Sequence, residues 1–347
     1  MLCFTQSPAE ALTRFVGERH FSHIAVLTDV NTAQCCWPLV KPALPDATLI
    51  TIEAGDEHKN LDSLVKVWQA LEQCGATRQS LLVNLGGGMV TDLGGLAAST
   101  FKRGIAFANV PTTLLSAVDA SVGGKTGINF SGLKNEIGLF REAEQVIIST
   151  SFLATLPGRE IKSGYAEMLK HGMLSSHDDF MRLLHIDFGH IDPATLLAQI
   201  EASVQVKQRI VEQDPTEHGL RRALNLGHTA GHALESHALR TGHPVPHGYA
   251  VAWGLVVESV ISHLRLKLPS ADLYALARFV RQHYDAPRIT CDDYPTLLSL
   301  MHHDKKSQHG EINCTLLSTC GHPVTGQAVT DDEMQEALDI FRDLMGV

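Results

Sequence analysis

Residues 81–92 read LLVNLGGGMVTD, an apolar strand that runs into three consecutive glycines and then into a helical pattern. Glycine lets the backbone turn sharply and approach a ligand closely, because no Cβ stands in the way. A helix that starts after such a turn presents free N–H groups and a partial positive charge, which suit a pyrophosphate. The segment differs from the G-x-G-x-x-G fingerprint, so a plain strand-to-helix turn is the alternative. It predicts a parallel α/β domain with a phosphate-binding turn.

Short apolar segments alternate with helical patterns on both sides of this turn. Strands are expected at 24–28, 48–52, 81–85, 105–110 and 145–149. Between the second and the third, apolar residues recur at helical spacing from Leu61 to Leu71, and Gly75 follows as a stop signal. Such alternation indicates a mostly parallel sheet covered by helices on both faces. Asp29 follows the first strand and could accept hydrogen bonds from a ribose, although an aspartate there also serves as a helix cap.

The second half of the chain has a different pattern. Long helices are expected at 161–174, 193–213, 227–240, 249–264, 271–284 and 331–345, and a short extended pair around 312–317 is the exception. The fold class expected is a Rossmann-like α/β domain with a parallel sheet over residues 1–157, followed by an all-α domain over residues 158–347. The first is the candidate NAD-binding domain and the second the candidate metal- and substrate-binding domain.

Composition limits the classes of function. The net charge of −10 over 347 residues argues against broad binding to nucleic acids or acidic membranes, so any anion site must concentrate its Lys and Arg locally. No apolar run reaches the roughly 18 residues that span a bilayer, and residues 1–20 lack the pattern of a secretory signal. Seven cysteines without C-x-x-C spacing fit reduced thiols better than disulfides or a four-cysteine zinc site. A cytoplasmic location is expected.

A second polar segment follows the fourth expected strand. Residues 110–135 read VPTTLLSAVDASVGGKTGINFSGLKN, in which Gly123-Gly124-Lys125-Thr126 resembles a phosphate loop. The first glycine of the Walker motif is missing, so an ATPase is disfavoured. The Gly, Lys, Thr and Asn residues, with Asp119 among them, suit an anionic ligand rich in hydroxyls. The alternative, a solvated loop with two surface lysines, does not explain the apolar residues between them.

Histidines and a carboxylate in the helical half are candidate metal ligands. Asn225, His228 and His232 are spaced i, i+3 and i+7, which places them on one helical face. From spacing alone His228 and His232 look like a zinc-binding pair, and His247 and Glu167 offer further ligand atoms. Three protein ligands would leave a position for substrate or water. The alternative is that some of the nineteen histidines are purely structural.

Candidate residues for a local positive charge in this half include Lys207, Arg221, Lys305 and Lys306. Each alone is more commonly a solvated surface residue than part of a site. Arg221 precedes Asn225 by four residues and so shares the helical face described above. Its guanidinium could bind a carboxylate through two parallel hydrogen bonds.

Seven segments occur in one order along the chain: GGGMVTDLGGLAASTFKRG, VPTTLLSAVDASVGGKTGIN, FLATLPGRE, SGYAEMLKHG, LRRALNLGHTAGH, HGYAVAWG and HDKK. Together they resemble one family, the 3-dehydroquinate synthases, within the wider sugar phosphate cyclases. The resemblance covers nearly the whole chain. It implies an enzyme that uses NAD and a divalent metal, Zn²⁺ or Co²⁺, in a cleft between its two domains.

The resemblance also implies roles for individual residues. Glu167, His228 and His247 would bind the metal, so His232 moves from the ligand pair to the substrate side. Arg103 would reach the substrate phosphate of a neighbouring subunit, which implies a homodimer. The remaining substrate-side residues would be Asp119, Asn135, Lys170, Lys207, Arg221, Asn225, Lys305 and Lys306. With Asp29, the candidate NAD contacts are Asp56, Lys59, Gly87, Gly88, Met89, Asp92, Thr112, Thr113, Lys125, Lys134, Phe152 and Thr155.

The implied reaction converts 3-deoxy-D-arabino-heptulosonate 7-phosphate, which carries a carboxylate and a phosphate, to 3-dehydroquinate and phosphate in the shikimate pathway to aromatic amino acids. Three alternatives remain. These are another cyclase such as a 2-deoxy-scyllo-inosose synthase, a metal-dependent polyol dehydrogenase that would release NADH, and a non-catalytic sensor of NAD or metal. Three positions depart from the family pattern. Tyr249 stands where a Glu is common, Asp214-Pro215 replaces the frequent Asp-Glu, and Asp56 replaces a Glu of longer reach.

Overall fold

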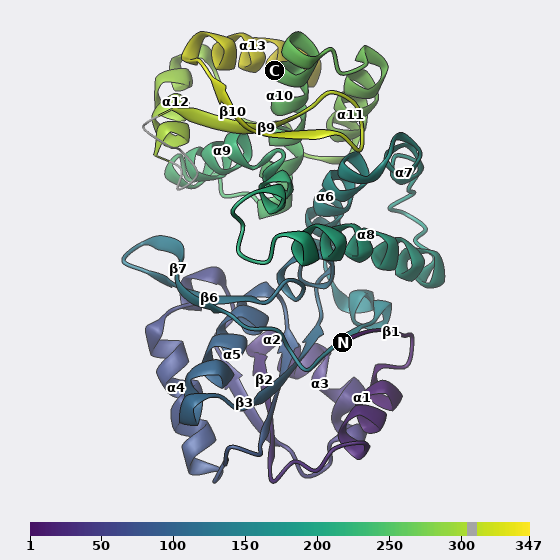
Figure 1. Cartoon of the computed structure of the whole chain (residues 1–347), viewed down its shortest axis with the longest axis vertical. Helices are drawn as coiled ribbons and strands as arrows, with labels where there is room; N and C mark the ends of the chain where they lie inside the picture. Colours follow the sequence, from purple (N-terminus) through teal and green to yellow (C-terminus); the bar gives the residue numbers. More distant parts are fainter. Residues whose placement is uncertain (304–310) are drawn as a thin grey trace. The chain divides into compact units, whose positions relative to one another are not determined.

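A computed structural model describes residues 1–303 and 311–347. The chain divides into two compact units (Figure 1). Unit 1 contains residues 1–157 together with 191–204, and unit 2 contains residues 158–190 and 205–347. The sequence had placed 191–204 in the second domain. The structure assigns this segment to unit 1, because α8 (Pro193–Gln213) starts in unit 1 and ends in unit 2.

Unit 1 is built on a six-stranded parallel sheet with the order β1-β8-β5-β4-β2-β3. The α/β fold class predicted for this part is confirmed. The five expected strands form at their expected places, with ends that shift by a residue at most. Strand β1 pairs in parallel with β8 at one edge and was not predicted, because three residues carry too little pattern. The strands are β1 (Leu2–Phe4), β2 (Ile24–Asp29), β3 (Thr48–Ile52), β4 (Leu81–Gly86), β5 (Ala106–Pro111) and β8 (Gln145–Ile148).

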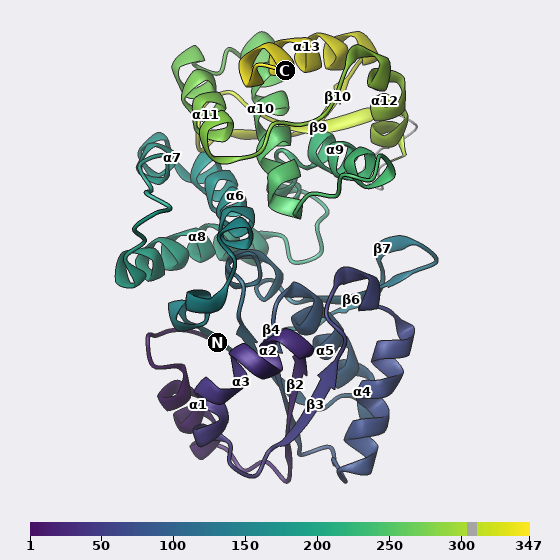
Figure 2. The ribbon, with the colours of Figure 1, turned by 180° about the vertical axis from the view of Figure 1, so that it is seen from behind.

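Helices cover both faces of this sheet (Figures 1 and 2). In β2, Ala25 and Leu27 pack into one core with α4 and α5, whereas Val26 packs into a second core with α1 and α3. The alternation follows from the two-residue period of a strand. A strand buried on both faces needs apolar residues throughout, as its sequence shows. The helices of unit 1 are α1 (Pro8–Gly17), α2 (Val30–Cys35), α3 (Trp37–Val40), α4 (Leu61–Gln73), α5 (Gly88–Thr100) and the first part of α8.

The polar segment 110–135 forms structure that its sequence did not reveal. A single π-helical turn, Ser116–Ala120, follows β5. An antiparallel hairpin then joins β6 (Lys125–Phe130) to β7 (Leu133–Phe140), with an irregularity in the pairing between Ile128 and Phe130. All eight residues of β7 are exposed, so the strand lacks the alternation of buried and exposed residues on which prediction depends.

Unit 2 is mainly helical. It contains the expected helices and two short ones, α7 and α12, that were not predicted. The helical fold class predicted for this part is confirmed, and β9 and β10 form an antiparallel hairpin where the extended pair was expected as the exception. Its elements are α6 (Gly158–Ser175), α7 (His177–Leu183), the end of α8, α9 (His228–Arg240), α10 (His247–Leu266), α11 (Ser270–His283), α12 (Tyr294–His302), β9 (Ile312–Leu317), β10 (Pro323–Val329) and α13 (Asp331–Met345).

Helix α10 runs through the middle of unit 2, which explains its apolar sequence. Fifteen consecutive residues from Gly248 to Ser262 are buried, including Glu258. A helix that is apolar all round is buried by neighbouring elements or by lipid. Among the described residues, no helix combines the length and hydropathy that crossing a bilayer requires.

Candidate active site

The glycine turn of unit 1 opens helix α5. Gly87 is the N-cap residue of α5 and, as a glycine, has no side chain that could accept a hydrogen bond from the first amides of the helix. The next strand is held alongside, because the Thr112 amide donates to the Gly86 carbonyl oxygen at 3.0 Å. A Cβ on Gly88 would come within 3.2 Å of Ala120. The turn is therefore tightly packed, and its helix N-terminus has the geometry that binds pyrophosphate in other folds.

Several predicted residues of unit 1 form a polar cluster beside α5. Lys59 is only 4% exposed, and its ammonium forms an ion pair with Asp92 and donates to Asn135 Oδ1 at 2.5 Å. Lys134 Nζ lies 3.6 Å from Asp56 Oδ2, and both of these side chains are more than half exposed. The structure thus brings together residues from the segments 55–59, 92 and 134–135, which are far apart in the sequence.

Two predicted NAD contacts have structural roles that need no ligand. Asp29 Oδ1 accepts the backbone N–H groups of Asn31 and Thr32, each at 2.8 Å, so this carboxylate caps α2. Phe152 is 1% exposed and packs in a core cluster with α1 and α3, which leaves its backbone as the part available to a ligand. Thr155, three residues on, is exposed.

Asp119 and the two threonines lie around the π-helical turn. Thr113 Oγ1 hydrogen bonds with the Ser116 hydroxyl at 2.9 Å and with its amide at 3.1 Å, which fixes the start of the turn. Asp119 is half-buried near the end of the turn, and Thr112 is buried just before it. Single π-helical turns frequently occur at functional sites. Lys125 follows on β6 and is exposed.

In unit 2, three helices bring together the carboxylate and the two imidazoles of the predicted metal site. Glu167 of α6 is fully buried. Its Oε1 lies 3.4 Å from His228 Nε2 of α9 and 3.7 Å from His247 Nε2 of α10. Two ligand atoms on one tetrahedral zinc ion are about 3.3 Å apart, given bonds of about 2.0–2.1 Å. The three side chains fit a single zinc or cobalt ion.

The other nitrogen of each imidazole is held by a neighbour. His228 Nδ1 lies 3.1 Å from the Leu226 carbonyl oxygen, and His247 Nδ1 lies 3.0 Å from Glu235 Oε2. Because both neighbours accept hydrogen bonds, they favour the tautomer that carries the proton on Nδ1 and leaves the Nε2 lone pair for a metal. Metal-binding histidines commonly have a partner of this kind.

A buried carboxylate positions the start of α9. Glu258 of α10 accepts hydrogen bonds from the backbone amides of Gly227, Thr229 and Ala230, at 2.7, 3.0 and 3.3 Å. These amides belong to the first turn of α9, where backbone N–H groups lack partners within the helix. Glu258 is completely buried. It therefore fixes the place of His228, the first residue of α9.

Gly248 allows the other histidine to reach α6. A Cβ at this position would lie 1.8 Å from the Ser163 carbonyl oxygen, so only glycine lets the first turn of α10 approach α6 this closely. The Gly248 amide also donates to Ser163 Oγ at 3.0 Å. His247, next along the chain, is thereby held near Glu167, one turn after Ser163 on α6.

Charges around these side chains act on one another. Lys170 is 1% exposed and forms an ion pair with Glu167. Burial alone would raise the pKa of Glu167, but the charges of Lys170 and His228 hold that pKa well below its usual value. Burial would lower the pKa of His247, but hydrogen bonds to Glu167 and Glu235 outweigh it and raise the pKa to about 9. The cluster is therefore built around an ionised carboxylate.

Other predicted residues of unit 2 lie close by. His232 is half-buried, and its ring centre is 5.3 Å from that of His228 and 5.8 Å from that of His247. One nitrogen from each of these three rings lies within 4.8 Å of the others, so proximity alone does not separate His232 from the ligands. The choice of Glu167 in its place stays a prediction. Lys207 of α8 is 6% exposed.

The predicted carboxylate-binding arginine lies in a 3₁₀ helix, Leu220–Asn225, which follows a turn held by Asp214. Asp214 accepts hydrogen bonds from the backbone amides of His218, Gly219 and Arg221, at 3.0, 2.7 and 3.0 Å. Arg221 is 2% exposed, and its guanidinium donates to the Pro215 carbonyl oxygen. Asn225 Nδ2 donates to Glu217 Oε1 at 3.2 Å. Pro215 therefore contributes through its backbone, which any residue at that position could do.

Arg103 lies in the 3₁₀ helix Phe101–Arg103, and two predicted lysines cannot be placed. Lys305 and Lys306 lie outside the described residues. Arg103 is exposed, in unit 1. Its φ is +68°, beside Lys102 at +50°. Left-handed backbone in non-glycine residues costs free energy, and it is often retained where function needs it.

Comparison with known proteins now adds the family. The model of the 3-dehydroquinate synthase N-terminal domain matches residues 49–163, and that of the C-terminal domain matches residues 164–307. The 3-dehydroquinate synthase of Parabacteroides distasonis is 46% identical over 338 residues, which cover 97% of this chain and 96% of that relative. This chain belongs to the 3-dehydroquinate synthase family.

Solved structures related to the 3-dehydroquinate synthase family share the fold. A structure of 2-deoxy-scyllo-inosose synthase, complexed with carbaglucose-6-phosphate, NAD⁺ and Co²⁺, has a TM-score of 0.85 and 22% identity. The match covers 99% of this chain and 96% of that one, and shows the fold alone. The 2-epi-5-epi-valiolone synthase of Streptomyces hygroscopicus, with NAD⁺ and Zn²⁺ bound, has a TM-score of 0.79 and 26% identity, over 95% and 93% of the two chains.

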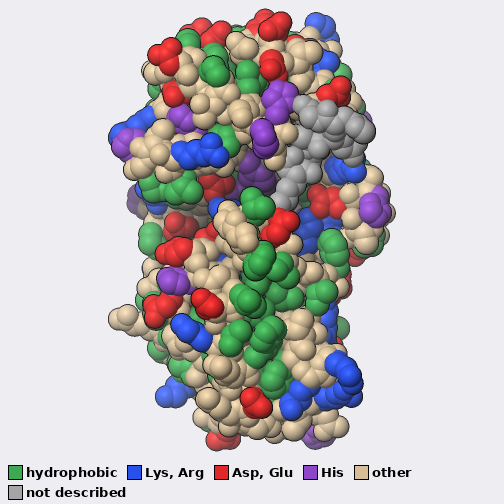
Figure 3. All heavy atoms as spheres, turned by 90° about the vertical axis from the view of Figure 1, so that its left-hand side faces the viewer, with side chains coloured by type: hydrophobic (Ala, Val, Ile, Leu, Met, Phe, Trp, Pro, Cys, Tyr) green, Lys and Arg blue, Asp and Glu red, His purple; other side chains and the backbone are tan. Residues whose placement is uncertain are grey.

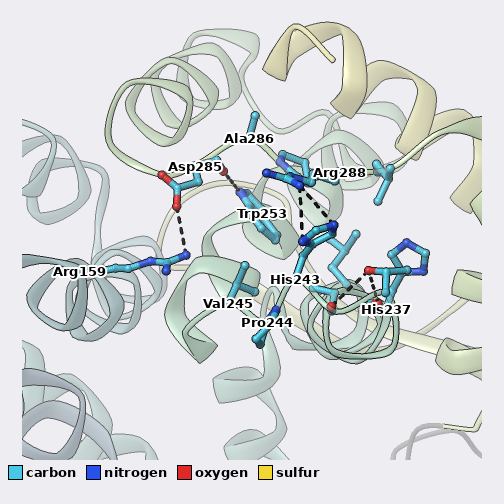
Figure 4. A pocket seen from close by; sticks show the side chains of 14 residues that line it. Arg159, His237, His243, Pro244, Val245, Trp253, Asp285, Ala286 and Arg288 are labelled. Atoms are coloured by element: carbon cyan, nitrogen blue, oxygen red, sulfur yellow. Dashed lines mark hydrogen bonds and ion pairs between the residues drawn. The ribbon is translucent and has the colours of Figure 1, made fainter.

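A pocket elsewhere in unit 2 contains none of the predicted site residues (Figure 4). Its volume is about 310 Å³, and it lies next to the segment that leads into α10. Arg159 Nη2 pairs with Asp285 Oδ2 at 3.1 Å, and Arg288 Nη1 lies 3.3 Å from the nearer ring nitrogen of His243. Both arginines are thus engaged by neighbours. Lys170, His228 and His247 of the 3-dehydroquinate synthase motifs lie beside Glu167 and not here, so we assign the candidate active site in unit 2 to the Glu167 cluster.

Two positioning residues, Glu235 and Glu258, were missed from the sequence. Glu258 had been noted only as a charge that argues against a membrane span. An acid within a long apolar helix was the available signal, because such a charge is retained only when buried partners compensate it. Glu235 lies on α9, three residues after His232, and nothing in its spacing distinguished it from a surface residue of that helix.

Proposed function

We propose that this chain converts 3-deoxy-D-arabino-heptulosonate 7-phosphate to 3-dehydroquinate and phosphate, as an NAD- and metal-dependent carbon–oxygen lyase of the shikimate pathway. The observation that carries the proposal is the convergence of Glu167, His228 and His247 from three helices in a member of this family. A carboxylate and two imidazoles leave room for substrate on a tetrahedral ion. Glu167, His228 and His247 would therefore hold zinc or cobalt in the working enzyme.

Each cofactor supplies one kind of chemistry. NAD⁺, if bound, would supply reversible hydride chemistry at C5 of the substrate. A divalent metal, if bound, would supply a positive charge that polarises the C5 oxygen. The N-terminus of α5, together with Lys59 and Asp92, would hold the dinucleotide in unit 1. Asp56 is shorter than the Glu that is usual at this position. Because it is exposed beside Lys134, it would still be able to hydrogen bond to the dinucleotide.

The protein's own groups would move protons and neutralise charge. Oxidation at C5 acidifies the proton at C6, so that phosphate can leave by elimination, and an intramolecular aldol step then closes the ring. We assign proton handling to Lys170, Lys207 and Asp119, and phosphate binding to Lys125, Asn135, Asn225, His232 and Arg103. Lys305 or Lys306 would add positive charge around the substrate. Both amines are buried in unit 2, and Lys170 forms an ion pair with Glu167 of the predicted metal site, which supports the assignment.

Arg221 would bind the substrate carboxylate, which favours this reaction over that of a 2-deoxy-scyllo-inosose synthase. The side chain is almost fully buried in the 3₁₀ helix Leu220–Asn225, and a guanidinium can bind a carboxylate through two parallel hydrogen bonds. A cyclase for a substrate without a carboxylate would have little use for it. A polyol dehydrogenase and a non-catalytic sensor are the remaining candidates, and the assay described below distinguishes them.

We further propose a homodimer in which Arg103 contacts the phosphate bound by the neighbouring subunit. Its exposure and its unfavourable backbone conformation support a role outside its own chain. The hairpin β6–β7 is a candidate interface. Figure 3 views the side on which β7 lies in Figure 1 and shows hydrophobic side chains gathered there. Large exposed apolar side chains on this hairpin are Phe130, Leu133, Ile137, Leu139 and Phe140.

We propose a cytoplasmic location. All seven cysteines lie among the described residues, and none of them forms a disulfide there. Free thiols are typical of proteins in reducing compartments. We also propose that unit 1 binds NAD and unit 2 binds the metal. The polar cluster around Lys59 in unit 1 and the cluster around Glu167 in unit 2 favour this division.

The test is a phosphate-release assay on the purified full chain with the heptulosonate substrate, with absorbance at 340 nm recorded in parallel. We expect phosphate release that needs NAD, that stops with a chelator and returns with Zn²⁺ or Co²⁺, and that leaves no net NADH. Net NADH without phosphate would instead identify a polyol dehydrogenase. Binding of both cofactors with no turnover would identify a sensor. Turnover of glucose 6-phosphate in place of the heptulosonate would identify the other cyclase.

A further inference from the structure

A second group of metal-ligating side chains lies in unit 2, separate from the candidate active site. It consists of His177, Asp272 and Cys320. His177 Nδ1 is 3.2 Å from Asp272 Oδ1, and Cys320 Sγ is 3.9 Å from Asp272 Oδ2. One ligand atom from each residue lies within 4.8 Å of the other two. None of the three belongs to the residues assigned to NAD, substrate or the catalytic metal.

Three elements that are distant in sequence present these side chains. His177 is the first residue of α7, Asp272 is in the first turn of α11, and Cys320 lies in the turn between β9 and β10. Helices α7 and α11 are neighbours in both ribbon views (Figures 1 and 2). A group gathered from positions about 50 to 140 residues apart does not arise from local helix geometry, because side chains on one helix meet only at three or four residues.

The backbone around the group is held in place before any ligand binds. The Gly321 amide donates to the Met173 carbonyl oxygen at 2.8 Å, which ties the β9–β10 turn to the end of α6. A Cβ on Gly321 would lie 2.7 Å from the Ser175 carbonyl oxygen, so the approach is close. Ser176 caps α7 through a bond of its Oγ with the Asp179 amide at 3.1 Å. Cys320 and His177 therefore occupy fixed positions.

The Asp272 carboxylate lies at the centre of the group. The residue is 5% exposed, and its carboxylate contacts a thiol and an imidazole. The N-terminus of α11 favours a negative charge there, but it requires neither the cysteine nor the histidine. Burial and the nearby Asp272 raise the pKa of Cys320 to about 12, so without a cation the thiol keeps its proton. A divalent cation would neutralise the carboxylate and displace that proton.

We propose that His177, Asp272 and Cys320 form a second metal site, which binds Zn²⁺ or another borderline divalent cation such as Co²⁺. The sulfur, nitrogen and oxygen set is that of tetrahedral zinc, and thiolate disfavours Mg²⁺ and Ca²⁺. Water completes the coordination, because the His177 side chain is 58% exposed and leaves the site open to solvent. Bound metal links α7, α11 and the β9–β10 turn. It is not required for the proposed reaction.

The experiment uses cobalt as a probe, because a thiolate bound to Co²⁺ gives a charge-transfer band in the near ultraviolet. The metal-stripped full chain is titrated with Co²⁺, and bound cobalt is counted after desalting. The catalytic ligands Glu167, His228 and His247 include no sulfur, so the band reports only on a cysteine-containing site. We expect two equivalents of cobalt and the band. Cys320→Ser should bind one equivalent, lack the band and keep phosphate release within about twofold.

Two further variants secure the interpretation. His177→Gln should weaken cobalt binding at this site at least tenfold, and the exposure of His177 makes this change compatible with folding. Cys291→Ser is the matched control, because Cys291 is exposed and contacts Arg342 and not this group. It should keep both equivalents and the band. A single equivalent in the parent chain, or a band that persists in Cys320→Ser and His177→Gln, would overturn the proposal whether or not the enzyme proves active.

Discussion

Glu258→Gln should destabilise unit 2 and weaken metal binding, although the residue lies outside the predicted ligands. The carboxylate accepts three backbone amides from the first turn of α9. Glutamine has nearly the same shape, but it carries no charge and has one acceptor oxygen. Its amide group would place N–H donors against backbone N–H donors in a fully buried site. The start of α9, and His228 with it, should move.

The magnitude follows from the bonds that are lost. A hydrogen bond to a charged group contributes about 1.5–3 kcal/mol, and leaving a buried donor without a partner costs about 1–3 kcal/mol. Because the three bonds share one carboxylate, they do not add fully. We expect the free energy of unfolding to fall by about 3 kcal/mol. For a folding unit of about 150–250 residues, this corresponds to a decrease in Tm of about 6–12 °C.

Thermal unfolding of the apo and zinc-loaded protein measures the first effect, and competition with a chromogenic chelator measures zinc affinity. The control is Glu336→Gln, an exposed glutamate on α13, which should change stability by less than about 0.5 kcal/mol. If Glu258→Gln matched this control in both Tm and zinc affinity, the argument that Glu258 positions His228 would be refuted.

Three further substitutions test the candidate active site. Glu167→Gln should lower phosphate release by more than about 100-fold, because a neutral amide is a poor zinc ligand, and near-normal turnover would refute the metal assignment. Glu235→Gln should weaken zinc binding about 10- to 100-fold, because His247 loses the carboxylate that holds its Nδ1. Turnover should return at saturating zinc. An unchanged zinc affinity would show that Glu235 does not position His247. Gly248→Ala should lower the free energy of unfolding by about 1–3 kcal/mol, because the added methyl group meets the α6 backbone. The control is Gly158→Ala, whose methyl group would enter open space and should cost much less. Equal effects of the two substitutions would contradict the packing argument.

The elements that the sequence predicted well are those with a regular burial pattern. Strand β3 and helices α8 and α13 have the ends expected from periodicity. In α13 the Thr330–Glu333 capping box is a local signal that needs no tertiary context. The hairpin β6–β7 was missed, because β7 is exposed along its whole length and a buried face is what produces alternation. The order of the strands in the sheet has no local signal either.

The candidate site shows a similar division. Spacing along α9 favoured His228 and His232 as the ligand pair, because a helix places residues four apart on one face. The resemblance to the family replaced His232 by Glu167 and His247, which no spacing rule connects. The structure brings these atoms within 3.4 and 3.7 Å, together with His232 close by.

The sequence by itself determined the family, the two kinds of domain and the residue types available for catalysis, because these depend on composition, local period and ordered motifs. Tertiary structure alone decided which atoms meet. Glu167, His228 and His247 lie on separate helices, and their approach depends on Gly248 and on the buried Glu258. The same packing gathers His177, Asp272 and Cys320. The physical reason is that side chains distant in sequence converge only when burial of apolar helix faces fixes how those helices pack.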